Sequence, residues 1–124
     1  MKKLTTSEEH VMQILWNLGE AFVKDIISQY PMPQPPYNTI SSVVRLLEKK
    51  GFVSHKAYGN THRYYPAISK DEYKKFYIKD TLQNYFENSF QQMVSFFAEK
   101  ENISMQELEL MLQEIKKKKM DQDG

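Results

Sequence analysis

The chain has 124 residues and a formal net charge of +1, a length that fits one domain or one small domain with an appended segment. It contains no cysteine, which excludes disulfides, thiolate metal sites and cysteine nucleophiles. No apolar run approaches the roughly 18 residues of a membrane span, and Glu8 and Glu9 interrupt the N-terminus before the apolar core of a signal peptide. We therefore expect a cytoplasmic protein without membrane insertion.

Charge is unevenly distributed along the chain. Residues 1–68 carry eight Lys or Arg against five Asp or Glu, whereas residues 69–124 carry nine against eleven. Most of the N-terminal excess lies between residues 38 and 68, where five cations accompany a single anion, Glu48. This pattern indicates either an anionic partner for that segment or an ordinary solvated basic face.

The first segment, "TTSEEHVMQILWNLG", predicts a helix, because Val11, Ile14, Leu15 and Leu18 recur at helical spacing. Thr6 and Glu9 have the spacing of a capping box, and Gly19 suits a left-handed helix end. The segment "AFVKDIISQYP" predicts a second helix of about two turns, after a strand of one or two residues at Ala21 and Phe22. The next segment, "PMPQPP", predicts a stiff loop, because proline cannot continue a helix.

The segment "YNTISSVVRLLEKKG" predicts a third helix, which Gly51 ends and whose apolar stripe is Ile40, Val43, Val44 and Leu47. Its opposite face begins with small polar residues, although Ser, Thr and Asn are indifferent helix formers. Capping would account for one of them, and hydrogen bonds to base edges in a DNA groove would account for the rest. That face comprises Asn38, Ser42, Arg45 and Lys49, with Thr39 and Ser41 beside it.

Two apolar and aromatic runs, "GFVSHKA" and "THRYYPAI", predict a β-hairpin around Tyr58-Gly59-Asn60. With two or four loop residues centred between Gly59 and Asn60, Lys56 lies opposite Arg63 and Ala57 lies opposite His62. An odd loop length would undo this pairing. Like charges directly opposite each other normally destabilise a sheet, so the pairing of Lys56 with Arg63 calls for an explanation.

Residues 69–124 predict two or three helices rich in Phe, Tyr and Met. Ser69 with Glu72, and Ser104 with Glu107, have capping-box spacing, and the four lysines at 116–119 indicate a helix end or a nucleic-acid contact. About 55 residues without a strand cannot bury these apolar faces alone, so we expect a dimerisation region; folding back on the first domain is the alternative. The candidate dimerisation residues are Tyr85, Phe86, Phe90, Met93, Phe97, Leu108, Met111 and Leu112.

The order of helix, short helix, turn, polar-faced helix and hairpin is that of a winged helix-turn-helix, a mainly α fold with a small β-hairpin. In this fold the helix after the turn lies in the DNA major groove, and the hairpin contacts the flanking backbone or minor groove. A phosphate between Lys56 and Arg63 would then neutralise their repulsion. The same fold also serves as a protein-interaction module without specific DNA binding, which stays open as the alternative.

Catalytic and metal sites find little support in the sequence. The three histidines have no cysteine partners and no ligand-like spacing, although His55 and His62 could approach each other across the hairpin. The four glycines are isolated, so they form no phosphate-binding loop. We therefore expect no enzymatic activity, no metal and no cofactor.

The chain resembles the penicillinase-repressor family of bacterial transcription regulators (the BlaI, MecI and CopY type) over nearly its whole length. The stretch "LTTSEEHVMQILW" is similar to the family's first helix, "NTISSVVRLLEKKGFV" to its recognition helix, "HKAYGNTHRYYP" to its wing and "SFQQMVSFFAEKENISMQELELM" to its dimerisation region. We accordingly expect a DNA-binding domain at residues 1–68 and a helical dimerisation region at residues 69–124.

The resemblance implies a homodimer that binds a palindromic operator in double-stranded DNA and represses genes for β-lactam resistance or a related stress response. It places Asn38, Thr39, Ser41, Ser42 and Arg45 toward the groove, and Lys56, His62 and Arg63 on the wing. Copper-responsive members end in a cysteine-rich tail that this chain lacks, so copper sensing is not expected.

The resemblance also bears on induction. β-Lactam-responsive members are inactivated when a membrane sensor triggers cleavage at an Asn-Phe bond in the dimerisation region. The aligned position here reads Phe96-Phe97. A sensor-protease system therefore remains a candidate partner, with Phe96 and Phe97 as the candidate cleavage position.

Overall fold

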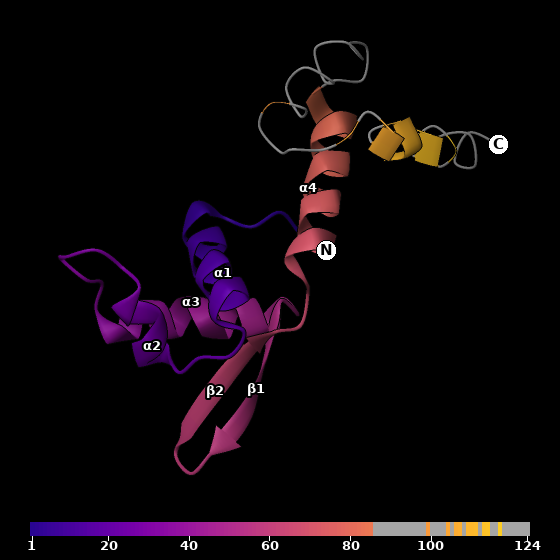
Figure 1. Cartoon of the computed structure of the whole chain (residues 1–124). Coiled ribbons are helices and arrows are strands. Elements are labelled where there is room, and N and C mark those ends of the chain that lie inside the picture. Colours follow the sequence, from indigo (N-terminus) through magenta and orange to yellow (C-terminus); the bar gives the residue numbers. More distant parts are fainter. Residues whose placement is uncertain are drawn as a thin grey trace. The chain divides into compact units, whose positions relative to one another are not determined.

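The computed structural model describes residues 1–85 and residues 99, 104, 106, 107, 109–111, 113, 114 and 117. Its elements are α1 (Thr6–Leu18), α2 (Val23–Ser28), α3 (Tyr37–Lys49), β1 (Val53–Tyr58), β2 (Thr61–Pro66) and α4 (Lys70–Tyr85) (Figure 1). By internal contacts the chain divides into two units, Met1–Tyr73 and Lys74–Gly124. The three N-terminal helices followed by an antiparallel hairpin confirm the predicted fold class.

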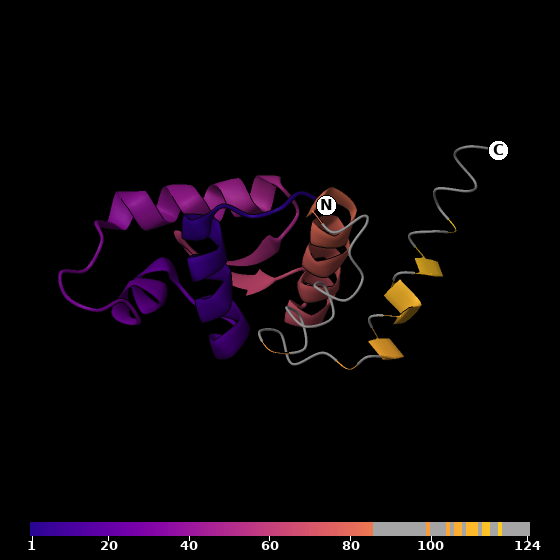
Figure 2. The same ribbon diagram turned by 90° about the horizontal axis from the view of Figure 1, so that it is seen from above.

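The core of the first unit forms where α3 packs on both α1 and α2 (Figure 2). The predicted apolar stripes supply most of this core, since Val11, Leu15, Ile26, Val44 and Leu47 are each fully buried. Leu18, the last member of the α1 stripe, is 41% exposed. It is the last residue of α1, and Gly19, with φ of +82°, turns the chain away directly after it. Burial of these stripes fixes which face of α3 stays at the surface.

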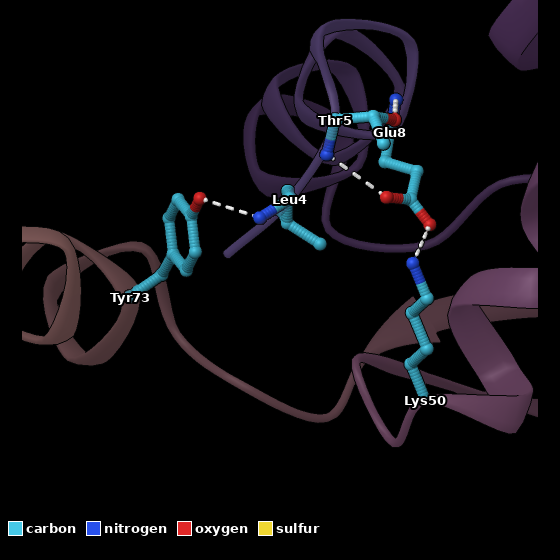
Figure 3. A network of polar contacts seen from close by, with 5 residues as sticks. All are labelled: Leu4, Thr5, Glu8, Lys50 and Tyr73. Carbon is cyan, nitrogen blue, oxygen red and sulfur yellow. Dashed lines mark hydrogen bonds and ion pairs between the residues drawn. The ribbon is translucent and has the colours of Figure 1, made fainter. Parts of the chain in front are cut away.

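The first helix begins one residue earlier than predicted. Thr5, not Thr6, is the N-cap: its hydroxyl accepts the Glu8 N–H at 3.2 Å, and Glu8 accepts the Thr5 N–H at 2.9 Å (Figure 3). The sequence contains two pairs with capping-box spacing, Thr5 with Glu8 and Thr6 with Glu9. The first pair forms because Glu8 is also held by a residue distant in the sequence.

That residue is Lys50, which follows α3 and whose ammonium lies 2.7 Å from the Glu8 carboxylate (Figure 3). Only 2% of Glu8 is exposed. Burial by itself raises the pKa of Glu8, but hydrogen bonds from Lys50 and Thr5 outweigh burial and hold the pKa below its ordinary value of 4.5. The ion pair therefore ties the C-terminal end of α3 to the first turn of α1.

The hairpin has the predicted register. Lys56 pairs with Arg63 and Ala57 with His62, around a two-residue turn of Gly59 and Asn60. Gly59 has φ of +59°, a conformation that glycine adopts without steric cost. The predicted short strand before the second helix is a single bridge: the N–H and C=O of Ala21 pair with Tyr64 of β2, at 2.9 and 2.8 Å. The hairpin is thereby attached along β2 to the segment between α1 and α2.

The start of α4 closes the first unit. The Ser69 hydroxyl accepts the Glu72 N–H at 3.0 Å and Glu72 accepts the Ser69 N–H at 3.3 Å, which confirms this predicted capping box. The Trp16 indole donates to the Ile68 carbonyl at 2.9 Å, and the Tyr73 hydroxyl accepts the Leu4 N–H at 3.0 Å (Figure 3). These contacts hold the end of the hairpin against α1.

In the second unit, the Ser104 hydroxyl accepts the Glu107 N–H at 3.2 Å, as the sequence predicted. Lys79 of α4 pairs with Glu114. Among the candidate dimerisation residues, Met111 is described and buried, and Tyr85 is the last residue of α4. The other candidates and Phe96 lie outside the described residues. Within the part of the chain that is described, no helix is long and apolar enough to cross a membrane.

Candidate nucleic-acid interface

The outer face of α3 presents a row of small polar side chains. Asn38, Thr39, Ser42 and Arg45 are exposed, and Ser41 is half-buried. They stay at the surface because Ile40, Val44 and Leu47 bury the opposite face of the same helix. The structure thus places all five predicted recognition residues on the accessible side of α3.

The expectation that one of these polar residues caps the helix was wrong. Pro36 is the N-cap, with φ of −62°, and no side chain caps the first turn. Proline is tolerated at this position because the residue before the first turn donates no backbone N–H to the helix. Within the described residues, the side chains of Asn38, Thr39, Ser41 and Ser42 make no hydrogen bond. Their donors and acceptors are therefore available to a partner.

The three predicted wing residues do not share one face of the hairpin. Side chains alternate between the two faces of a strand, and directly paired residues share a face. Lys56 and Arg63, which pair, lie on one face, whereas His62 and its partner Ala57 lie on the other. The wing therefore offers two distinct surfaces.

An acidic residue of the protein itself, Glu20, lies between the two opposed cations. One carboxylate oxygen of Glu20 lies 3.3 Å from the Lys56 ammonium, and the other lies 3.3 Å from the Arg63 guanidinium. Glu20 therefore already offsets part of the repulsion for which the sequence suggested a phosphate, and phosphate binding there stays a prediction. The sequence gives no sign of the contact, because Glu20 precedes the hairpin by more than thirty residues.

On the His62 face, the hairpin and α3 enclose a pocket of about 520 Å³. Its basic lining residues are Arg45 of α3, His62 of β2 and Lys24 of α2, and no Asp or Glu lines it. Its remaining lining residues are Phe22, Val23, Tyr37, Ser41, Asn60, Thr61 and Tyr64. The pocket brings the predicted recognition helix and one predicted wing residue together.

Lys24 is the functional candidate that sequence reasoning missed. It is exposed, and it makes no hydrogen bond or ion pair with the described residues. It lies on the short helix α2, where the sequence shows a single cation followed directly by an acidic residue, Asp25. The packing of α2 beside α3 places Lys24 at the pocket, which its sequence context does not reveal.

The two hairpin histidines meet, as the sequence allowed. Their rings stack with centroids 4.1 Å apart, and Nδ1 of His55 lies 2.5 Å from a carboxylate oxygen of Glu48. In the described ranges, no group of three or more His, Cys, Asp or Glu side chains is placed to hold a metal ion. The stack instead fixes the orientation of the His62 ring beside the pocket.

Comparison with known proteins places this geometry in a family. The sequence model described as penicillinase repressor matches residues 4–117. The methicillin resistance regulatory protein MecI of Staphylococcus aureus (strain N315) is 27% identical over 117 residues, covering 94% of this chain and 95% of that protein. The penicillinase repressor of Bacillus licheniformis is 24% identical over 123 residues, or 96% of each chain.

A solved structure titled CopR repressor is 30% identical and covers 52% of this chain and 96% of that chain, with a TM-score of 0.45. The relatives named above are a regulatory protein and a repressor, not enzymes, which agrees with the expectation of no catalytic activity. The family match runs from the residue before the α1 capping box through α3, the hairpin and α4. The chain belongs to the penicillinase repressor family of transcriptional repressors.

Proposed function

We propose that the protein represses transcription by binding a specific DNA sequence with α3 and the hairpin. The observation that carries this proposal is the outer face of α3, where uncommitted polar side chains stand next to Arg45 and the acid-free pocket. Short hydroxyl and amide side chains allow close approach to base edges, and arginine is suited to bidentate contact with guanine. A surface of this kind serves DNA reading better than it serves protein packing.

In this proposal α3 enters the major groove with its N-terminal turns first. Asn38, Thr39, Ser41, Ser42 and Arg45 contact base edges, while His62 and Lys24 contact the flanking phosphates beside the pocket. The hairpin follows the backbone next to the groove, as wings do. Occupancy of a promoter by such a complex excludes the transcription machinery.

The wider assembly forms part of the proposal. Residues 1–68 act as the DNA-binding domain, and residues 69–124 pair two copies so that they read a palindromic operator. Similarity to MecI and to a penicillinase repressor supports control of β-lactam resistance or a related stress response in the cytoplasm. Relief of repression through a membrane sensor and cleavage near Phe96 and Phe97 is part of the same proposal.

Replacing Lys24 with alanine tests the contribution of the pocket. We expect weaker binding to every duplex and a salt dependence shallower by about one unit in the slope of log K against log salt, because one phosphate contact is lost. Fluorescence anisotropy titrations at several salt concentrations measure both quantities. Lys70→Ala is the matched control, because it removes the same charge from an exposed site that does not line the pocket.

An equal effect of Lys24→Ala and Lys70→Ala would show that general charge, not the pocket, sets the affinity. No binding of the full chain to any duplex at low salt, together with capture of a protein partner that survives nuclease, would favour the protein-interaction module instead.

A further inference from the structure

We propose that Glu20 restrains the DNA affinity of the hairpin by holding Lys56 and Arg63 with its own carboxylate. The inference rests on the proposed DNA-binding function and names a residue that lowers the affinity of the hairpin for DNA. Each carboxylate oxygen takes one cation, at 3.3 Å in both cases. Glu20 thus occupies the position that a backbone phosphate would take between the two cations.

Backbone pairing explains why Glu20 lies there. The antiparallel bridge between Ala21 and Tyr64 aligns this segment beside β2, so Glu20 lies opposite Tyr65 and is a diagonal neighbour of Arg63. Side chains alternate between faces, which brings Glu20 to the face of Arg63 and, across the hairpin, of Lys56. The contact is therefore built into the fold and does not depend on a flexible loop.

Aromatic rings also lie close to the two cations. The Arg63 guanidinium lies 6.0 Å from the centre of the Phe22 ring, and the Lys56 ammonium lies 5.6 Å from that of Tyr65. Both distances are within reach of a cation–π interaction. The rings and the carboxylate together hold the side chains of Lys56 and Arg63 near one another on the face that their backbone pairing gives them.

Solvent reaches all three charged groups. The side chains of Glu20, Lys56 and Arg63 are 35%, 58% and 41% exposed. Exposed ion pairs are weak, because water screens them. An incoming phosphate can therefore compete with Glu20, and water can solvate the displaced carboxylate. The restraint lowers phosphate affinity without abolishing it.

The two faces of the wing differ in whether an acidic residue accompanies their cations. On the His62 face no acidic residue lines the pocket that contains Lys24 and Arg45, whereas on the Lys56 face a carboxylate offsets one of the two cations. Binding without sequence preference depends on how many phosphates a protein neutralises. Glu20 reduces that contribution and leaves the base-reading face of α3 untouched, so it makes tight binding depend on α3.

The experiment compares the full-length wild type with Glu20→Gln, which removes the charge but keeps the shape. On a random-sequence duplex, we expect Glu20→Gln to bind about two- to tenfold more tightly, the range that two exposed ion pairs allow, with a steeper salt dependence. Glu9→Gln is the matched control, because it makes the same change in net charge on α1, away from the hairpin. Its affinity is expected to equal that of the wild type.

A double-mutant cycle shows whether Glu20 acts through the two cations. In a Lys56→Ala/Arg63→Ala background, Glu20→Gln is expected to change neither the affinity nor the salt slope. Circular dichroism melting verifies that every variant is folded. A wild type that binds no duplex refutes the proposed function itself. If the wild type binds but Glu20→Gln binds equally well or more weakly, the role of Glu20 is overturned. It is also overturned if Glu20→Gln keeps its full gain in affinity in the Lys56→Ala/Arg63→Ala background.

Discussion

Replacing Arg45 with alanine is expected to weaken binding to the preferred duplex by about 1–3 kcal/mol, the usual loss for one good base contact. Arg45 is exposed on α3 one turn after Ser41, and its Nε donates to the Ser41 carbonyl at 3.4 Å. That bond directs the side chain toward the small polar residues at the start of the helix. Binding to a random duplex should fall much less, so the ratio of specific to non-specific affinity drops.

Lys49→Ala is the matched control for Arg45→Ala. It removes the same charge from the same helix, at an exposed position one turn further on. We expect it to weaken both duplexes alike, because a phosphate contact carries no sequence information. Anisotropy titrations of both variants on the preferred and the random duplex measure this affinity ratio. An Arg45→Ala variant that keeps the wild-type affinity ratio would remove Arg45 from the base-reading set.

Glu8→Gln is expected to lower the free energy of unfolding at pH 7 by about 1–3 kcal/mol, since a hydrogen bond to a charged group contributes that much when buried. The carboxylate is nearly inaccessible, and it joins the α1 cap to Lys50 at the end of α3. Gln keeps the shape and a bond to Thr5, but it loses the charge that pairs with Lys50. Urea unfolding of both proteins at equal concentration measures the difference.

The difference between wild type and Glu8→Gln should depend on pH. The folded-state pKa of Glu8 lies below its ordinary value of 4.5, so its contribution is fully present above pH 4.5. It is lost as the pH falls through the folded-state pKa. Glu9→Gln, half-exposed on the same turn, should change stability by only a few tenths of a kcal/mol. A Glu8→Gln penalty that stays constant from pH 7 to strongly acidic pH would contradict the ion pair.

Much of the fold could be predicted because local patterns specify it. Periodic apolar residues located α1 and α3, and prolines located the loop between α2 and α3. The turn residues Gly59 and Asn60 set the hairpin register, because only an even loop centred on them pairs Lys56 with Arg63. These features depend on residues that are neighbours in the sequence, so spacing alone reveals them.

The electrostatics of the site could not be predicted, because they depend on residues distant in the sequence. Glu20 meets the hairpin through a single backbone bridge at Ala21, and Lys24 reaches the pocket only through the packing of α2. The N-cap of α1 is Thr5, which pairs with Glu8, and not the expected Thr6. Glu8 is held in this position by Lys50 from the end of α3. Charge counts along the chain detected the basic segment but not which cations were already paired.

The most direct measurement of the central claim is selection of bound sequences from a pool of random duplexes by the full-length protein. The account predicts enrichment of one sequence with two inverted half-sites, and loss of that enrichment in Arg45→Ala but not in Lys49→Ala. It also predicts that affinity for the selected duplex falls steeply with salt. A pool that remains unenriched after selection at low salt would contradict sequence-specific DNA binding by α3.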